Sequence, residues 1–395
     1  MMREYEWMYS HCATAEQIDA PACLEALLEQ MEAGLSGRGR IPMLPSYLST
    51  RIPVPEGAEC LVMDAGGTNL RTAKAVYRQG AWELRDLEKT AMPGTGGERS
   101  FGEFYGDLAA SLRRLGDAER VGLCFSYNVS LERTLDGKLD FWCKEVRVPE
   151  AVGRFVGASL REALGADCRA VHVLNDSVAA MLGAEDAQVG VILGTGVNVC
   201  YPERCARIPK VPGDLKAETM ILSTEVGEFD GFPRSSFEET VIAASDAPDS
   251  ARAEKQCSGG YLGSVIGRAW AAAAEEGLLP DSFREGICDL ASVSQILAGA
   301  AENTLPGEAV EIAKIAISRA AKIAAILCAA PILRTERNNP KVAVEGSQYW
   351  RLTGFREHFH RELDRLLPEG STCRILRAEN ACLIGAARAA FAGHM

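Results

Sequence analysis

Residues 60–77, CLVMDAGGTNLRTAKAVY, constrain the fold of this chain more than any other segment. An apolar run from Cys60 to Met63 stops at Asp64, passes two glycines, and continues from Leu70 in the alternating apolar and polar order of a β-strand. Two such strands around a short turn form a β-hairpin. The segment therefore predicts a hairpin whose turn carries an aspartate, two glycines and two polar residues.

The turn of this hairpin has the composition of a phosphate-binding loop. Gly66 and Gly67 have no Cβ, so backbone N–H groups can face an anion, and Thr68 and Asn69 add side-chain donors. It is not a Walker loop, because no lysine follows the second glycine and a strand rather than a helix comes next. An ordinary tight hairpin turn is the alternative interpretation.

A second segment repeats the design and favours the phosphate interpretation. Residues Val189 to Tyr201, VGVILGTGVNVCY, form an apolar strand, a turn of Gly194, Thr195 and Gly196, and a returning strand. Two strands that each break at a turn of glycine and threonine indicate two similar halves that face one nucleotide.

Length and charge restrict the class of protein. A chain of 395 residues is long enough for two domains, and a net charge of −12 disfavours nucleic acid or anionic membrane as a partner. The N-terminal MMREYEWMYSHC lacks the apolar core of a signal peptide. The longest nearly uncharged run, Ala320 to Leu333, contains Lys322 and is too short to span a bilayer.

The thirteen cysteines are scattered and odd in number, and none forms a CxxC pair. Cys60, Cys124, Cys200 and Cys328 lie in apolar segments and are predicted to be buried hydrophobic residues. A zinc site at Cys200 and Cys205 is disfavoured. This usage of cysteine predicts a protein of the reducing cytoplasm.

Strands and helices alternate after the first hairpin, as in α/β domains. Apolar spacing predicts helices over 101–115 and 150–164 and buried strands over 121–125 and 171–174. The polar stretch 130–145, which contains Trp142, is predicted to be a long ligand-binding loop, with a solvated hairpin whose tryptophan packs inward as the alternative.

Asn175 and Asp176 follow the strand over 171–174, and the apolar segment SVAAML follows them as a helix. An aspartate at this position is either an N-cap or a functional acid at a strand end. The neighbouring Asn175 favours recognition of a polar ligand.

The second half of the chain has further polar residues at element ends. Glu225 stands between an apolar segment and a glycine, and Ser245 to Ser258 is predicted to be a polar loop. A long alanine-rich helix is predicted to stop at Pro331. A strand over 342–344 leads through a glycine and a serine into one helix from about Tyr349 to Leu366, and 383–391 forms a closing helix.

Taken together and in this order, the motifs resemble the hexokinase family in its eukaryotic-type branch. The segments that carry the resemblance are DAGGTNLR, FSYNV, FWCK, VLNDSVA, GTGVN, STEVGEF, EKQCSGGYLG and VAVEGSQY. The chain departs from the family pattern at Asn128, Cys143 and Val226, where the family usually has proline, threonine and tryptophan. The departures bear on which sugar is preferred.

The resemblance implies roles for individual residues. Asp176 would be the catalytic base, with Lys144 beside it as a second catalytic residue. The sugar would be bound by Ser126, Cys143, Lys144, Asn175, Asp176, Asn198, Glu225 and Glu254. ATP would be bound by Asp64, Gly66, Gly67, Thr68, Asn69, Arg71, Gly194, Thr195, Gly196, Gly346 and Ser347. Asp64 would hold Mg²⁺ through water.

The resemblance also implies the fold and the activity. The fold would be the α/β, two-domain actin-like ATPase (RNase H-like) fold, with a small domain of residues 58–174 plus 381–395 and a large domain of residues 1–57 and 175–380. The activity would be ATP-dependent phosphorylation of the 6-hydroxyl of glucose or a similar hexose. The alternatives are a catalytically weak sugar sensor and a kinase for another polyol or an amino sugar. Its partners would be small molecules, and either a monomer or a homodimer is compatible with the sequence.

Overall fold

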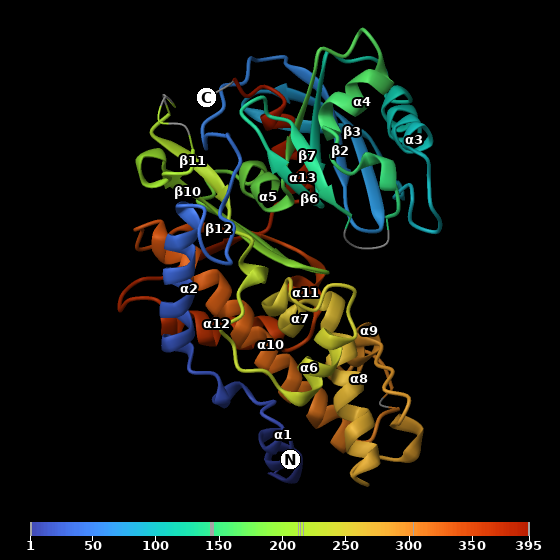
Figure 1. Ribbon diagram of the computed structural model, residues 1–395, viewed down its shortest axis with the longest axis vertical. Coiled ribbons are helices and arrows are strands. Elements are labelled where there is room, and N and C mark those ends of the chain that lie inside the picture. Colours follow the sequence, from blue (N-terminus) through green and yellow to red (C-terminus); the bar gives the residue numbers. More distant parts are fainter. Residues whose placement is uncertain are drawn as a thin grey trace.

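Two separate β-sheets organise the protein, and each contains one of the two predicted glycine turns (Figure 1). The computed structural model describes residues 2–142, 146–211, 213, 215, 217–302 and 304–393. A five-stranded sheet forms the smaller lobe and a six-stranded sheet the larger one. Helices α5 and α13 lie between the two sheets in Figure 1.

The five-stranded sheet has the order β4-β3-β2-β5-β8. Strands β2 and β3 form the predicted hairpin, paired antiparallel from Glu59 with Val76 to Ala65 with Leu70. Strands β5 and β8 run parallel to β2, so the carboxyl ends of all three strands lie at one edge of the sheet. The five strands are β2 (Glu59–Ala65), β3 (Asn69–Arg78), β4 (Ala81–Ala91), β5 (Arg120–Phe125) and β8 (Ala170–Leu174).

Alternating side chains of β2 fill two different cores, as the two-residue period of a strand requires. Leu61 and Met63 pack against helices α3 and α4, whereas Cys60 and Val62 face helix α13 on the opposite side. The helices on this sheet are α3 (Phe101–Arg113), α4 (Val156–Leu164) and α13 (Ala381–Ala389). The sheet is therefore covered on both faces, as expected for an α/β lobe.

The six-stranded sheet has the order β1-β11-β10-β9-β12-β13. Strands β9 and β10 pair antiparallel around the second turn, which confirms the predicted repeat of the hairpin design. Strand β12 runs parallel to β9 on the other side. The strands are β1 (Leu44–Pro45), β9 (Val189–Leu193), β10 (Val197–Arg204), β11 (Thr219–Ser223), β12 (Lys341–Glu345) and β13 (Arg374–Leu376).

Helix α10 forms the centre of the larger lobe and packs against α2, α8 and α12. Arg319 on α10 is 3% exposed and donates from Nε to Glu238 Oε1 of α6 at 2.8 Å, and its Nη1 reaches Thr14 O at 2.9 Å. These bonds tie the N-terminal segment to the helical core. The helices of this lobe are α1 (Met2–Ser10), α2 (Ala20–Leu35), α6 (Ser236–Ala243), α7 (Arg252–Cys257), α8 (Gly259–Glu275), α9 (Leu290–Leu297), α10 (Gly307–Arg334), α11 (Ser347–Arg351) and α12 (Phe355–Leu366), with 3-10 turns at η1 (Ala15–Gln17), η3 (Cys205–Arg207), η4 (Val226–Glu228) and η5 (Asp281–Phe283).

By length and composition alone, α10 could cross a membrane, and it is the one helix in the described residues that meets this test. Most of its apolar stretch is buried inside the protein, which is typical of a core helix. Its alanines let neighbouring helices approach closely.

The two sheets meet through helices α5 (Asp176–Gly183) and α13. A Cβ at Gly183 would overlap the backbone carbonyl of Ala381, and a Cβ at Gly385 would overlap that of Ala179. Glycine at these two positions therefore lets the helices cross with their backbones in contact. Because α5 follows β8 of the five-stranded sheet and precedes β9 of the six-stranded sheet, this crossing connects the two lobes.

Over its described part, residues 130–142, the stretch 130–145 is largely a hairpin and not the predicted long loop. Strands β6 (Asn128–Leu131) and β7 (Gly137–Phe141) pair antiparallel, with η2 (Pro149–Ala151) after them. Trp142 Nε1 donates to Val148 O at 2.7 Å, and its ring packs edge-on against Phe104. The alternative, a hairpin with an inward tryptophan, is thus confirmed.

Four predictions about helices need correction. The helix predicted over 150–164 begins only at Val156, after the 3-10 turn Pro149–Ala151. Residues 252–257, predicted as loop, form α7, because Ala253 and Cys257 bury themselves in the core. Helix α10 continues past Pro331 to Arg334: only one turn follows the proline, so one main-chain bond is lost while Ile332 stays buried. The helix predicted through Leu366 is broken at Gly354, whose φ of +84° starts α12.

Candidate active site

The first glycine turn closes on itself with main-chain and side-chain bonds. Gly66 N donates to Asn69 O at 3.0 Å, and Asn69 Nδ2 donates to Thr68 Oγ1 at 2.9 Å. Tyr127 OH supports the turn from below by donating to Gly66 O at 2.7 Å. The side chains of Thr68 and Asn69 remain exposed, so the turn is ordered and accessible to a ligand.

Asp64 lies directly before this turn and is 7% exposed. Arg71, its antiparallel partner on β3, donates to Asp64 Oδ2 from Nε at 2.9 Å and from Nη2 at 2.5 Å. Both bonds reach the same oxygen, so they leave Oδ1 for another ligand. A carboxylate oxygen of this kind, together with water and phosphate oxygens, suits Mg²⁺, which keeps several waters when it binds. The chemistry of Asp64 therefore fits a water-mediated magnesium site.

Carboxylates from both lobes approach the start of helix α13. The hydrogen bond with Cys124 lowers the pKa of the buried Cys382 thiol, but burial and the charges of Asp64, Glu345 and Asp176 raise it, and the net shift is upward. The Cys382 thiol also lies 3.8 Å from Asp176 O. The end of β2, the end of β12 and the start of α5 therefore all lie near Cys382.

The second glycine turn is held by the N-terminus of α8. Gly259 N donates to Gly194 O at 2.8 Å and Gly260 N to Thr195 O at 3.1 Å. Within the turn, Gly194 N donates to Gly196 O at 3.0 Å. Thr195 is exposed on this fixed backbone.

Gly346 brings the junction between β12 and α11 against the same turn. Its φ is +122°, and a Cβ there would overlap Leu193 O and lie 2.7 Å from Gly194 N. Ser347 follows at the start of α11 and is exposed. The structure thus places Gly194, Thr195, Gly346 and Ser347 together, as a shared nucleotide site requires.

Two buried polar atoms near this junction support a polar ligand there. Ser258 Oγ and Gln348 Oε1 have no hydrogen-bond partner among the described residues, although both side chains are almost fully buried. Buried polar atoms in native proteins are normally paired. The unpaired atoms and the exposed Thr195 and Ser347 therefore fit a nucleotide.

Asn175, and not Asp176, is the N-cap of α5. Asn175 Oδ1 accepts from Ser177 N at 2.8 Å, while Asp176 is the first helical residue. The interpretation of Asp176 as the N-cap is therefore wrong. Asp176 Oδ1 does accept from Ser177 N at 2.9 Å, which orients its carboxylate at the strand end.

Asn198 connects three segments of the site. Its Nδ2 donates to Glu225 Oε1 at 2.6 Å and lies 3.5 Å from Asn175 Oδ1, and its Oδ1 accepts from Glu225 N at 3.0 Å. Glu225 has the left-handed backbone conformation, with a φ of 59°, which turns the chain sharply after β11. The strand end before α5, strand β10 and the turn after β11 are thereby joined.

Glu254 reaches the same cluster from α7. Its Oε2 accepts from Val197 N at 2.9 Å, directly after the second glycine turn. A Cβ on Gly196 would lie 2.5 Å from this oxygen, so glycine there makes room for the carboxylate. Glu254 therefore stands where the predicted sugar and nucleotide sites meet.

Three carboxyl groups lie close enough to influence one another. Burial raises the pKa of Glu225 to about 7, and the charges of Asp176 and Glu254 also raise it, while hydrogen bonds from Ser223 and Asn198 lower it. A cluster of acids in which the pKa of Glu225 is raised, beside two glycine turns, is a typical candidate for a functional site.

Ser126 is the remaining predicted site residue that the structure describes. Ser126 N donates to Ala65 O at 3.1 Å, which places Ser126 beside the first turn. Cys143 and Lys144 lie outside the described residues. Asn128 and Val226, two departures from the family pattern, lie on β6 and η4.

Ser223 is a residue that the sequence interpretation missed. It ends β11, and its Oγ contacts Asn198 Nδ2 at 2.9 Å and Glu225 Oε1 at 2.8 Å. A polar residue two positions before a predicted ligand, at the end of a strand, was the signal that could have identified it.

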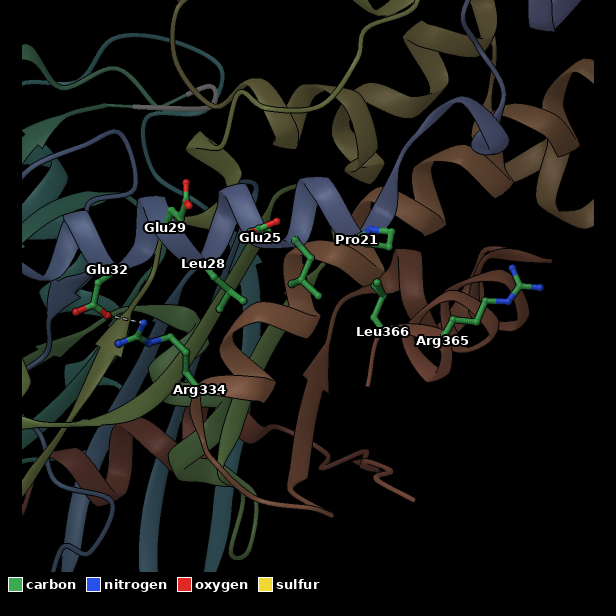
Figure 2. A pocket seen from close by; sticks show the side chains of 9 residues that line it. Pro21, Glu25, Leu28, Glu29, Glu32, Arg334, Arg365 and Leu366 are labelled. Atoms are coloured by element: carbon green, nitrogen blue, oxygen red, sulfur yellow. Dashed lines mark hydrogen bonds and ion pairs between the residues drawn. The ribbon is translucent and has the colours of Figure 1, made fainter. Parts of the chain in front are cut away.

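A pocket of about 550 Å³ lies elsewhere, between α2 and the ends of α10 and α12 (Figure 2). Leu24, Leu28 and Leu366 form its apolar part, and glutamates of α2 and two arginines surround them. Arg334 is already paired there with Glu32 at 2.9 Å. None of the predicted site residues lines this pocket.

Comparison with solved structures identifies the architecture. A hexokinase from Schistosoma mansoni, solved in complex with glucose, superimposes with a TM-score of 0.81 over 94% of this chain and 95% of that one, at 22% identity. The fold is thus the two-domain α/β fold of hexokinase structures, which is the actin-like ATPase fold.

Sequence comparison is more specific. The Hexokinase family profiles match residues 10–185 and 188–392. Hexokinase-7 of Oryza sativa subsp. japonica is 28% identical over 91% of this chain and 89% of its own length. Hexokinase-1 of Arabidopsis thaliana is 31% identical, but over 64% of this chain and 56% of its own length. The chain belongs to the hexokinase family.

Proposed function

We propose that this protein transfers the γ-phosphoryl group of ATP to the 6-hydroxyl of glucose or a similar hexose, giving ADP and hexose 6-phosphate. The observation that carries the proposal is the side chain of Asn198, which binds Glu225 and approaches Asn175 beside the Gly194–Gly196 turn. A set of sugar-binding groups next to a phosphate-binding turn is the arrangement that a sugar kinase needs.

The sugar would be held by paired donors and acceptors. Asn175 and Asn198 offer amide groups, and Glu225 and Glu254 offer carboxylate oxygens, all from different segments. Several hydroxyls of a hexose can each find a partner in such a set. Ser126, Cys143 and Lys144 would complete the site from the small lobe.

Asp176 would act as the general base. The oxygen of the 6-hydroxyl forms a bond to the γ-phosphorus, the bond from that phosphorus to the β–γ bridging oxygen breaks, and the hydroxyl proton passes to the Asp176 carboxylate. Such a base contributes roughly 10²- to 10⁴-fold in rate. Lys144 would stabilise the negative charge that develops.

The phosphates would be bound by the two glycine turns, with Thr68, Asn69 and Arg71 on one side and Thr195 on the other. Gly346 and Ser347 would contact the adenosine. Mg²⁺, when bound near Asp64, supplies neutralisation of phosphate charge. Family membership supports ATP as the phosphoryl donor.

The domain bounds and the compartment are part of the proposal. Residues 58–174 plus 381–395 would form the small domain, with 1–57 and 175–380 as the large one, supported by the separation into two sheets. The cytoplasm is the proposed compartment, supported by the twelve described cysteines, which are all free of disulfides.

A coupled assay that detects ADP tests the function, with ATP, Mg²⁺ and a panel of glucose, fructose, mannose, glucosamine and polyols. Turnover of one or more hexoses, with the product identified as the 6-phosphate, is expected. Calorimetric binding of a hexose without any turnover would overturn the kinase and favour the sugar sensor. Exclusive turnover of a polyol or amino sugar would correct the substrate class.

A further inference from the structure

Ser223 lies between two of the proposed sugar ligands, Asn198 and Glu225. It is 2% exposed at the end of β11. Its hydroxyl donates to Glu225 Oε1 at 2.8 Å and accepts from Asn198 Nδ2 at 2.9 Å, while Asn198 Nδ2 itself reaches Glu225 Oε1 at 2.6 Å. The three side chains form a closed triangle around one carboxylate oxygen.

The Glu225 carboxylate needs this support although its backbone is held in place. The backbone has a left-handed conformation between β11 and η4, and its N–H donates to Asn198 Oδ1 at 3.0 Å, but the long side chain has several rotatable bonds that the backbone does not restrict. Two hydrogen bonds on Oε1 fix the carboxylate plane. The fixed plane leaves Oε2 directed away from the triangle.

The geometry points to Ser223 as a positioning residue that holds the Glu225 carboxylate, and Asn198 with it, in the orientation that binds the sugar hydroxyls. The inference rests on the proposed hexose kinase function. Ser223 acts through Glu225 and touches neither the reacting hydroxyl nor the phosphates in this proposal.

The charges around Glu225 explain why a donor is needed there. The charges of Asp176 from α5 and Glu254 from α7 act on it, and the neutral side chains of Asn198 and Ser223 donate hydrogen bonds to it. Burial and both acids raise the pKa of Glu225, whereas the hydroxyl of Ser223 lowers it by bonding the charged form. Ser223 thus favours the carboxylate at neutral pH.

The test is Ser223→Ala with kinetics across pH 5.5 to 9. KM for the hexose should rise about tenfold at pH 7.5, as expected for loss of a hydrogen bond to a charged group, while kcat changes less than about threefold. The acidic limb of the kcat/KM profile should move to higher pH. Ser223→Thr keeps the hydroxyl and should restore most of the affinity.

Ser46→Ala is the matched control. Ser46 is also a buried serine, 1% exposed, and its hydroxyl donates to Ile221 O at 2.7 Å in the same sheet without touching the site. This variant should lose similar stability, measured by thermal melting, with KM and the pH profile unchanged.

The outcomes separate the inference from the function on which it rests. Wild-type turnover with an unchanged KM and pH profile in Ser223→Ala would overturn the positioning role alone, as would equal effects of Ser223→Ala and Ser46→Ala. If wild type binds a hexose without turnover, the dissociation constant from calorimetry replaces KM. A tenfold increase of this constant in Ser223→Ala would then support the positioning role, and no change would overturn it. A wild type that neither binds nor phosphorylates any sugar would overturn both proposals.

Discussion

The guanidinium of Arg71 donates two hydrogen bonds to a single oxygen of Asp64, at 2.9 Å from Nε and 2.5 Å from Nη2. The two residues are direct cross-strand partners on either side of the first glycine turn. The pair therefore fixes the carboxylate proposed to bind magnesium at the mouth of the turn proposed to bind phosphate.

Removal of Arg71 should affect both stability and nucleotide use. Arg71→Ala leaves the nearly buried Asp64 carboxylate without its partner, so the free energy of unfolding should fall by about 1 to 3 kcal/mol and KM for MgATP should rise at least about fivefold. Urea unfolding and steady-state kinetics measure the two effects. Lys74→Ala on the same strand is the control, since the carboxylate of its partner Glu59, at 2.7 Å, is exposed, unlike that of Asp64, and the pair should contribute below about 1 kcal/mol. Equal effects of both variants on KM would contradict the role of Arg71.

Asp176→Asn should preserve folding and lose turnover. Asparagine keeps the size and a hydrogen bond to Ser177 N but cannot accept a proton, so kcat should fall by at least about 10²-fold with little change in melting temperature. Since Asn175 caps α5, a change of capping cannot explain such a loss. Asp289→Asn, a true N-cap substitution on α9, is the control and should leave kcat unchanged. A kcat within a few-fold of wild type for Asp176→Asn would remove the catalytic assignment.

Glu225 should give the protein a pH-dependent stability. Its pKa is raised from 4.5 to about 7, so the folded state binds a proton more tightly than the unfolded state. The stability that this proton gives the folded state is full below about pH 4.5 and is lost as pH rises through 7. Glu225→Gln removes the titration. Relative to this variant, the free energy of unfolding of wild type should fall by at most about 3 kcal/mol between pH 4.5 and 7.5. The fall should stay below this limit because the side chain is partly exposed and solvent screens its charge. Chemical denaturation of both proteins across this range measures the difference, and parallel stability curves would show that Glu225 titrates normally.

Gly346→Ala should damage the nucleotide site through the backbone. The new Cβ would overlap Leu193 O and crowd Gly194 N at a φ that only glycine adopts easily, so Gly194 must move and KM for ATP should rise about tenfold or more. Gly370→Ala imposes a similar left-handed strain, with a φ of +77°, where a Cβ meets nothing within 4 Å. This control should lose about 1 kcal/mol of stability without a change in KM for ATP. Matching kinetics in the two variants would show that the close contact at Gly346 does not order the site.

Local chemistry in the sequence determined the hairpins and most of the strand ends. The breaks are visible because one apolar run stops at Asp64 before two glycines and the other stops at Gly194, and the alternation of apolar and polar residues marks the returning strands. Cys60, Cys124, Cys200 and Cys328 are buried as their apolar neighbours predicted. The order of motifs also pointed to the family that the profiles match.

Only the tertiary structure decided which residues meet and which local signals are overruled. Asn175 rather than Asp176 is the cap of α5. Both side chains can cap a helix, so the sequence does not decide between them, and the backbone conformation at the start of the helix does. Helix α10 continues past Pro331 because burial of Ile332 offsets the loss of one main-chain hydrogen bond. Helix α7 forms in a polar stretch because Ala253 and Cys257 pack into the hydrophobic core. The sequence did not identify Ser223 for the same reason. Its proposed role depends on its hydrogen bonds to Asn198 and Glu225, and contacts between segments are set by tertiary packing, which no single segment encodes.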